Sequence, residues 1–400
     1  MERTCPNAQP FRNVAGSVVF VSLLFFLTFI ARFIFSPLMP TISGDIAITS
    51  GQVGALFFMA AVGGLLGSLA AGTISTRFNH RGTLLTAVFG ISVVLVVSAL
   101  VDSVWALGSV LFALGLFSGM NQPSVVAVIT AMVRREDWGK ALSVQQAAPP
   151  LGLVAAPLLA VGLLTIFSWR ASLVGLGLFA AVLGVVLLRF RGLAEFPGDP
   201  PRLRLVGPLI RLRSFWLMIG LMALGMGAQV GVYTMLPLFL TEEKLMSIPS
   251  ANALLGIANI SPLAMVFVAG WATDRIGERW AMFGALFLTG CATVLVGVAD
   301  GLWLRVGIFL LPAFAVCFFS PAFSALSRIV QPNRRSVVAA LAPPIAFIVG
   351  GGLLPVALGY MGQHYTFALG FAIIGATTVA CSAAAFLVRL LREDEMEEGC

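Results

Sequence analysis

The segment from Arg189 to Arg213, RFRGLAEFPGDPPRLRLVGPLIRLR, holds six arginines and four prolines and is the only long polar stretch inside the chain. Six apolar segments precede it, near residues 14–40, 52–75, 82–101, 104–132, 141–166 and 170–188. Six more follow it, near residues 214–240, 250–273, 280–298, 302–327, 337–360 and 365–390. A helix that crosses a bilayer needs about 20 mostly apolar residues. The sequence therefore predicts an all-α polytopic membrane protein with twelve transmembrane helices.

The composition agrees with a membrane location and excludes several other classes. Of the 400 residues, 59% are hydrophobic and only 10% are charged, whereas about 25% of residues are charged in a typical soluble domain. A soluble enzyme, a disordered scaffold and a nucleic-acid-binding domain are thereby excluded. The five cysteines lack metal-ligand or redox spacing, so we expect no metal site. The first apolar run, residues 14–35, is too long for a signal peptide and is predicted to remain as a membrane helix.

The positive charges predict the orientation in the membrane. Twenty of the 24 lysines and arginines lie in the two ends, the linker and one alternating set of loops. The other set of loops contains only Arg170, Lys244 and Arg305, and Arg32 lies inside the first helix. Because cytoplasmic loops are enriched in Lys and Arg, we expect both termini in the cytoplasm, with the chain in the cell (inner) membrane. The net charge of +7 is interpreted as topological, which leaves the lipid bilayer as the partner and no nucleic acid.

The two halves repeat one plan. Glycines and prolines recur at nearly one offset: Gly72 and Gly270 are 198 positions apart, as are Pro123 and Pro321, while Pro40 and Pro237 are 197 apart and Pro149-Pro150 and Pro343-Pro344 are 194 apart. Such repeats are typical of carriers that rock one bundle against another around a central site. We therefore predict two pseudo-symmetric six-helix bundles, residues 1–188 and 214–400, joined by a cytoplasmic linker, residues 189–213. The second bundle ends in a short acidic tail.

One loop carries a family motif. Residues Gly270-Trp-Ala-Thr-Asp274-Arg275-Ile-Gly277-Glu-Arg279 match the pattern G-x-x-x-D-R-x-G-x-R of the major facilitator superfamily of secondary transporters, which the whole chain resembles. In the first half the equivalent loop keeps Gly72, Arg77 and Arg81, but Thr76 and Asn79 stand where the family has Asp and Gly. The resemblance implies that this loop latches the outward-facing state. The predicted latch residues are Gly270, Asp274, Arg275, Gly277, Arg279, Gly72 and Arg77. A basic turn alone would explain the arginines but not Asp274 or Gly277.

Small residues suggest close helix packing in the first half. The predicted helix 141–166 contains Gly152-Leu-Val-Ala-Ala156-Pro157, a loose version of a pattern that the family's antiporters carry, with Ala156 in place of a glycine. Helix packing explains it equally well. In the predicted helix 52–75, small residues recur at every fourth position, at Gly63, Gly67 and Ala71. We expect this stripe to pack between the two halves.

Arg32 is the one charged residue deep in an apolar segment. It lies in the run Arg32-Phe-Ile-Phe-Ser36-Pro37-Leu-Met-Pro40, and Thr28, Arg32 and Ser36 share one helix face. Some bacterial members of the family carry a similar R-F-x-x-x-P-L-x-P run at the central cavity. A guanidinium suits a carboxylate, phosphonate or sulfonate. The alternative is that Arg32 extends toward the membrane surface or binds carbonyl groups near Pro37.

Neutral polar residues lie on helices that line the cavity in this family. The predicted substrate-binding set is Thr28, Arg32, Ser36, Asn121, Gln122, Gln145, Gln229, Tyr233, Asn259 and Ser320. Gln229 is 197 positions from Arg32 and occupies its repeat-related place. Each neutral residue could instead hydrogen-bond between helices.

No acidic residue lies in the middle of a predicted helix. Proton antiport of cations relies on a buried carboxylate, and the sequence offers none for this role. Anion exchange, uniport, and uptake in which the substrate or Glu242 carries the proton all stay open.

These observations predict a secondary transporter, not an enzyme, that moves a small organic anion by alternating access around Arg32. It is expected to work as a monomer and without a cofactor. Two alternatives share the fold: an exporter of hydrophobic, drug-like compounds, and a membrane sensor that no longer transports, which the departures at Thr76 and Asn79 would fit.

Overall fold

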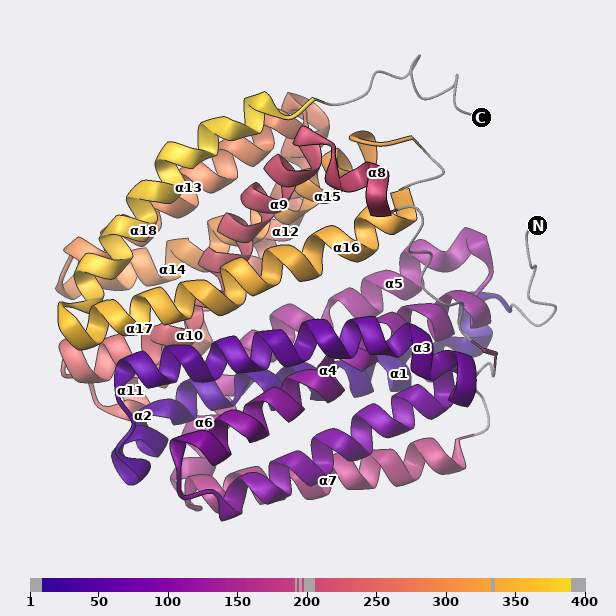
Figure 1. Cartoon of the computed structure of the whole chain (residues 1–400), viewed down its shortest axis with the longest axis horizontal. Coiled ribbons are helices and arrows are strands. Elements are labelled where there is room, and N and C mark those ends of the chain that lie inside the picture. Colours follow the sequence, from indigo (N-terminus) through magenta and orange to yellow (C-terminus); the bar gives the residue numbers. More distant parts are fainter. Residues whose placement is uncertain (1–8, 191–192, 194–195, 198–205, 332–334, 390–400) are drawn as a thin grey trace. The chain divides into compact units, whose positions relative to one another are not determined.

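The computed structural model describes residues 9–190, 193, 196–197, 206–331 and 335–389. This part of the chain is almost entirely helical (Figure 1), and its one β-interaction is an isolated parallel bridge between Gln9 and Val133. Eleven helical spans in it are long and apolar enough to cross a membrane. The span Ser50–Leu100 has 51 residues, enough for two crossings. The all-α polytopic fold is confirmed.

Between residues 9 and 190 the chain forms seven α-helices: α1 (Phe11–Phe33), α2 (Phe35–Ile46), α3 (Ser50–Val97), α4 (Val104–Met132), α5 (Trp138–Gln146), α6 (Ala148–Leu164) and α7 (Trp169–Arg189). Two short 3₁₀ turns, η1 (Ser98–Leu100) and η2 (Arg135–Asp137), flank α4. Together α1 and α2 form the first span and continue through Pro40 to Ile46, beyond the predicted end at residue 40. Prolines are tolerated in membrane helices because neighbouring groups satisfy the freed carbonyls.

The described residues of the second half form eleven α-helices: α8 (Val206–Ile210), α9 (Arg213–Met226), α10 (Tyr233–Leu238), α11 (Ile248–Ala258), α12 (Ser261–Ile276), α13 (Glu278–Val298), α14 (Gly301–Cys317), α15 (Phe319–Arg328), α16 (Arg335–Phe347), α17 (Leu354–His364) and α18 (Phe367–Ser382). Three π-helical segments interrupt or extend them: η4 (Gly227–Val232), η5 (Phe239–Glu243) and η7 (Ile348–Leu353). A 3₁₀ segment, η8 (Ala383–Leu387), follows α18.

Contacts divide the chain into two compact units. The first unit comprises Met1–Leu38 and Met59–Pro201, and the second comprises Met39–Phe58 and Arg202–Cys400. The segment Met39–Phe58, which comes from the first half of the sequence, is thus packed with the second. The helix α3 is shared, because its first nine residues belong to the second unit and its remainder to the first.

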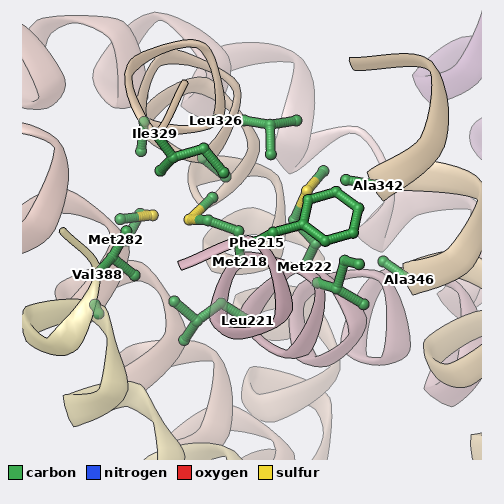
Figure 2. Packing of buried hydrophobic residues seen from close by; sticks show 14 of the residues in the cluster. Phe215, Met218, Leu221, Met222, Met282, Leu326, Ile329, Ala342, Ala346 and Val388 are labelled. Carbon is green, nitrogen blue, oxygen red and sulfur yellow. The ribbon is translucent and has the colours of Figure 1, made fainter. Parts of the chain in front are cut away.

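Each unit has its own apolar core. In the first unit, Val18, Val21, Leu24 and Phe25 of α1 pack among buried residues of α4 and α7. In the second, Phe215, Met218 and Met222 of α9 meet residues from α13, α15 and α16 (Figure 2). Figure 2 labels, besides these, Leu221, Met282, Leu326, Ile329, Ala342, Ala346 and Val388. Methionine side chains fill irregular gaps between helices, which suits a core made of several short helical pieces.

The glycine stripe of α3 packs inside one unit. A Cβ built on Gly63 would overlap the carbonyl oxygen of Phe112 and lie 3.0 Å from the nitrogen of Leu116, and Gly67 meets the carbonyl of Leu116 in the same way. Both partners belong to α4, which is in the first unit together with this part of α3. Our prediction that the stripe packs between the halves was wrong. The spacing showed a helix–helix contact but not which helix would provide the partner.

A single residue separates the two crossings of α3. Asn79 has φ 56° and ψ 174°, in a region that is almost restricted to glycine. Gly277, 198 positions later, has φ 80° and ψ 162° between α12 and α13. The two loops therefore share one backbone turn, although their sequences differ. The Oδ1 atom of Asn79 accepts a hydrogen bond from the amide of Gly82 at 2.8 Å and so caps the second crossing.

We expect Asn79→Gly to stabilise the protein. Glycine removes backbone strain of about 1–3 kcal/mol, whereas replacing an Asn cap by Gly costs only a few tenths of a kcal/mol. Asn79→Ala is the matched control, because it removes the cap and keeps the strain, and it should lower stability. Thermal unfolding of the purified protein in detergent measures both. A melting temperature of Asn79→Gly at or below that of the wild type would contradict this account.

Candidate functional site

Arg32 lies at the crossing of α3 and α4 in the first unit. A Cβ built on Gly64 would lie 3.7 Å from Nη2 and 3.9 Å from Nη1 of Arg32, and 3.8 Å from the carbonyl oxygen of Gly115. The guanidinium therefore sits over a glycine of α3, beside the backbone of α4. The residue is half-buried. This placement favours a role within the helix bundle over extension to the membrane surface.

Thr28 and Asn121, two predicted binding residues, meet one helical turn from Arg32. The side-chain amide of Asn121 donates to Oγ1 of Thr28 and, at 3.3 Å, to the carbonyl oxygen of Leu24. Thr28 itself donates to the same carbonyl at 3.0 Å. Both side chains are buried, and Oδ1 of Asn121 has no hydrogen-bond partner within the described part of the chain. A buried acceptor of this kind is costly, so this pair is a candidate for more than helix packing.

The other predicted residues of the first unit occupy different surroundings. Ser36 is fully buried one turn beyond Arg32, and Gln145 of α5 is 1% exposed. The Nε2 atom of Gln145 lacks a partner among the described residues. Gln122 is exposed, because its neighbour Asn121 takes the face of α4 that contacts α1. Among the predicted residues of the first unit, Asn121 is hydrogen-bonded to Thr28, and Arg32 lies one helical turn from Thr28, near Gly64 and Gly115. These residues are called the Arg32 neighbourhood below.

In the second unit the predicted residues are dispersed over four elements. Gln229 is half-buried in η4, and Tyr233, at the start of α10, is 3% exposed. Asn259 uses its side-chain amide within its own helix, where it donates to the carbonyl of Leu255 at 2.8 Å. Ser320, in α15, is exposed. None of these four residues carries a charge like that of Arg32.

The sequence did not predict the π-helical turns. The segment η4, which contains Gln229, packs against η7 through glycines, since a Cβ on Gly227 would lie 3.4 Å from the Cα of Gly350. A π-turn accommodates one residue more than an α-helical turn, and such turns often occur at functional sites. The runs Gly225-Met-Gly227 and Gly350-Gly351-Gly352 signal close approach but not the extra residue per turn.

The loop between α12 and α13 forms an ion pair through Glu278, which stands at a variable position of the motif. Glu278 binds Arg328 of α15 at 2.7 Å and accepts a hydrogen bond from Ser324 at 3.1 Å. Asp274 is exposed, and Arg275 lies over the ring of Trp271, 5.5 Å from its centroid. The remaining motif residue, Arg279, is exposed as well.

The equivalent loop of the first half binds its surroundings through other groups. Arg81 donates to the carbonyl oxygens of Leu187 and Leu188 at the end of α7, at 3.4 and 2.9 Å. Arg77 is exposed and Gly72 is half-buried. His80 corresponds to Glu278, and its Nδ1 lies 3.4 Å from Oγ of Ser124 in α4. In both units the first residue after the turn thus reaches a serine on the neighbouring helix.

A sequence model of the Major Facilitator Superfamily matches residues 21–246 and 217–399. The chain belongs to the Major Facilitator Superfamily. Its relatives there include an MFS-type efflux pump of Mycolicibacterium smegmatis, 25% identical over 94% of this chain and 91% of that protein. The 4-hydroxybenzoate transporter PcaK of Pseudomonas aeruginosa is 25% identical over 46% of this chain and 41% of its own.

Solved structures of the superfamily share the fold. A bacterial homologue of the human lysosomal transporter Spinster, in an inward-facing and occupied conformation, superposes with a TM-score of 0.79 at 16% identity. The alignment covers 95% of this chain and 97% of that one. Membership in this superfamily and its fold make the chain a multi-pass secondary transporter rather than an enzyme.

Adjacent glycines of α3 provide a matched test of the α3–α4 crossing. Gly63→Ala forces the backbones apart and should cost about 1–3 kcal/mol, as over-packing does. Gly64→Ala places a methyl group at ordinary contact distance from Arg32 and should leave the melting temperature unchanged or slightly raised. Thermal unfolding in detergent measures the difference, and equal melting temperatures for the two variants would refute the crossing described here.

The Glu278–Arg328 pair should contribute measurably to stability. Because both side chains are partly exposed, with 16% and 33% of their surface accessible, a double-mutant cycle of Glu278→Gln and Arg328→Gln should give a coupling of about 0.5–1 kcal/mol. Asp274→Asn should change stability by less than about 0.5 kcal/mol. Unfolding in mixed detergent measures both effects. A larger loss for Asp274→Asn than for Glu278→Gln would reverse this ranking.

Proposed function

We propose that this transporter moves small organic anions with a carboxylate or sulfonate group, and that Arg32 binds the anionic group. The proposal is supported above all by the position of the guanidinium over Gly64, at the α3–α4 crossing. A charge near a bilayer centre costs about 2.5–3.5 kcal/mol on insertion scales, so such residues are seldom kept without a use.

The chemistry of the neighbourhood suits an anion. The guanidinium is planar and presents several donors that match two oxygens of one carboxylate. Gly64 has no side chain, and the atoms nearest to a Cβ built on it are at van der Waals contact distance. The backbone therefore leaves room beside the positive charge. Thr28 and Asn121 add uncharged polar groups one turn away on α1 and on α4.

One relative gives independent support. PcaK is named as a transporter of 4-hydroxybenzoate, an aromatic carboxylate, and it aligns with just under half of this chain. This similarity agrees with an organic anion as the substrate class.

Export of hydrophobic, drug-like compounds is the second candidate. It is favoured by the similarity to the M. smegmatis efflux pump, which extends over nearly the whole chain. In that case Arg32 would hold α1 against α3 and α4, and its charge would not decide which compounds are carried.

We further propose the arrangement that the charge distribution predicts. Two six-helix bundles, residues 1–188 and 214–400, are joined by the linker 189–213, both termini face the cytoplasm, and the monomer is the working unit. The predicted latch residues of the two loops, from Gly72 to Arg77 and from Gly270 to Arg279, then face the cytoplasm.

Arg32→Gln should abolish most anion transport. Losing one charge-assisted bidentate contact removes about 1.5–3 kcal/mol, which corresponds to a decrease of about 10- to 100-fold. Counterflow of labelled benzoate, 4-hydroxybenzoate and a sulfonate in proteoliposomes measures it. Arg32→Lys should retain part of the transport, because the charge remains but the fork is lost.

Arg305→Gln is the control, since Arg305 is an exposed arginine of α14 and its loss should leave counterflow intact. Unchanged anion transport in Arg32→Gln would exclude the proposed role of Arg32. Export of lipophilic cations that is insensitive to Arg32→Gln would favour the second candidate.

A further inference from the structure

The chain passes from the second unit to the first inside α3, between Phe58 and Met59. Ser50–Phe58 packs in the second unit, whereas α3 from Met59 onward belongs to the first. Alternating access requires the units to move relative to each other. The contacts that hold Ser50–Phe58 in the second unit therefore influence how readily such a movement occurs.

Two of these contacts are close approaches of the backbones of α3 and α17. A Cβ on Gly54 would lie 2.7 Å from the Cα of Val356, and one on Gly359 would lie 3.1 Å from the carbonyl carbon of Ser50. Both approaches bring α3 onto α17. They contain no group that gains or loses a proton, so they hold the segment equally at every pH.

One contact of the segment does involve a titratable group. The hydroxyl of Ser50 donates to Oε2 of Glu242 at 3.0 Å, and the two residues are 192 positions apart in the sequence. Glu242 lies in η5, at the end of the span Arg213–Glu243. This bond fastens the first residue of α3 to the last turn of that span.

The charges next to Glu242 are bound to other groups. Glu243 accepts hydrogen bonds from the amides of Phe367 and Ala368 at the start of α18, the shorter at 2.7 Å. Lys244 forms an ion pair with Asp300 at 2.6 Å. Lys244, the cation nearest in sequence, is thus engaged by another carboxylate, whereas Glu242 accepts a hydrogen bond from a neutral hydroxyl.

The elements around η5 carry few other charges. Residues Ser50–Phe58 of α3, the helix α11 and the helix α18 contain no charged side chain. The remaining charged or titratable groups at these helix ends are Asp45, Glu243, Lys244, Asp300, Arg305, Tyr360, His364 and Tyr365. The ring of His364 packs on Tyr360 at 4.4 Å between centroids.

We propose that Glu242 is a proton-binding site that controls the release of the start of α3 from the second unit. A hydrogen bond to an ionised carboxylate is about twice as strong as one between neutral groups. Binding of a proton to Glu242 converts the carboxylate into a neutral acid, which weakens the Ser50 contact and favours release. If release is proton-dependent, uptake becomes proton-dependent too, and this consequence rests on the proposed function. The pH-dependent release itself does not.

The test uses a buried cysteine on the released segment. Val53 is fully buried, and Val53→Cys in a background without the native cysteines should react with a thiol reagent only when the segment separates. We compare its labelling rate in membranes with and without Glu242→Gln, from pH 8 to pH 4. The ratio of the two rates at each pH removes the pH dependence of the thiol itself.

Glu242→Gln imitates the protonated acid and should label about tenfold faster at pH 8, and the ratio should fall to about one at pH 4. Ser50→Ala should behave in the same way, because it removes the other partner. Asp102→Asn is the matched control; this carboxylate pairs with Arg170 in the first unit, and its ratio should stay near one throughout.

A ratio near one at every pH would overturn the proposal, and so would a ratio that is equally high at pH 8 and pH 4. A variant that failed to fold would label fast at pH 4 too, so convergence at low pH also shows that the fold is intact. Because no substrate is present, this result is independent of whether Arg32 binds an organic anion.

Discussion

The lipid environment of the helices is the constraint on which the rest of the structure depends. Hydrocarbon offers no hydrogen-bond partner, so each backbone group must be satisfied within its own helix, and it gives helices little apolar reason to associate. Van der Waals packing at points of close backbone approach then becomes the main force between helices. Inside the first unit such approaches occur at Gly63 and Gly67 with α4, and inside the second at Gly290 with Gly375 between α13 and α18.

The same constraint explains what the sequence predicted well. Apolar length defines membrane helices directly, so the long apolar spans could be predicted from the sequence. The backbone turn at Gly277 recurs at Asn79 although the residue differs. Which helix packs against which could not be predicted from the sequence. The stripe at Gly63 showed that some helix comes close, but any helix with a matching groove would satisfy that pattern.

The candidate site shows a similar division. Arg32, Thr28 and Asn121 could be selected because polar atoms are costly in an apolar segment, and the structure places them in one neighbourhood of the first unit. Gly64 could not be selected, since its contribution is the side chain it lacks. Ser50 and Glu242, 192 positions apart, were equally hidden, because Ser50 packs with the half of the chain to which it does not belong in sequence.

The π-helical turns of α9–α10 and α16–α17 carry a consequence for symmetry. An α-helix advances about 100° per residue, and a π-turn accommodates one residue more, so every side chain beyond η4 or η7 is rotated by roughly that angle. Residues at repeat-related positions, such as Pro40 and Pro237, therefore need not lie on corresponding faces of their helices. Within the second unit, each π-turn thus brings residues onto one helix face that an uninterrupted α-helix would place on different faces.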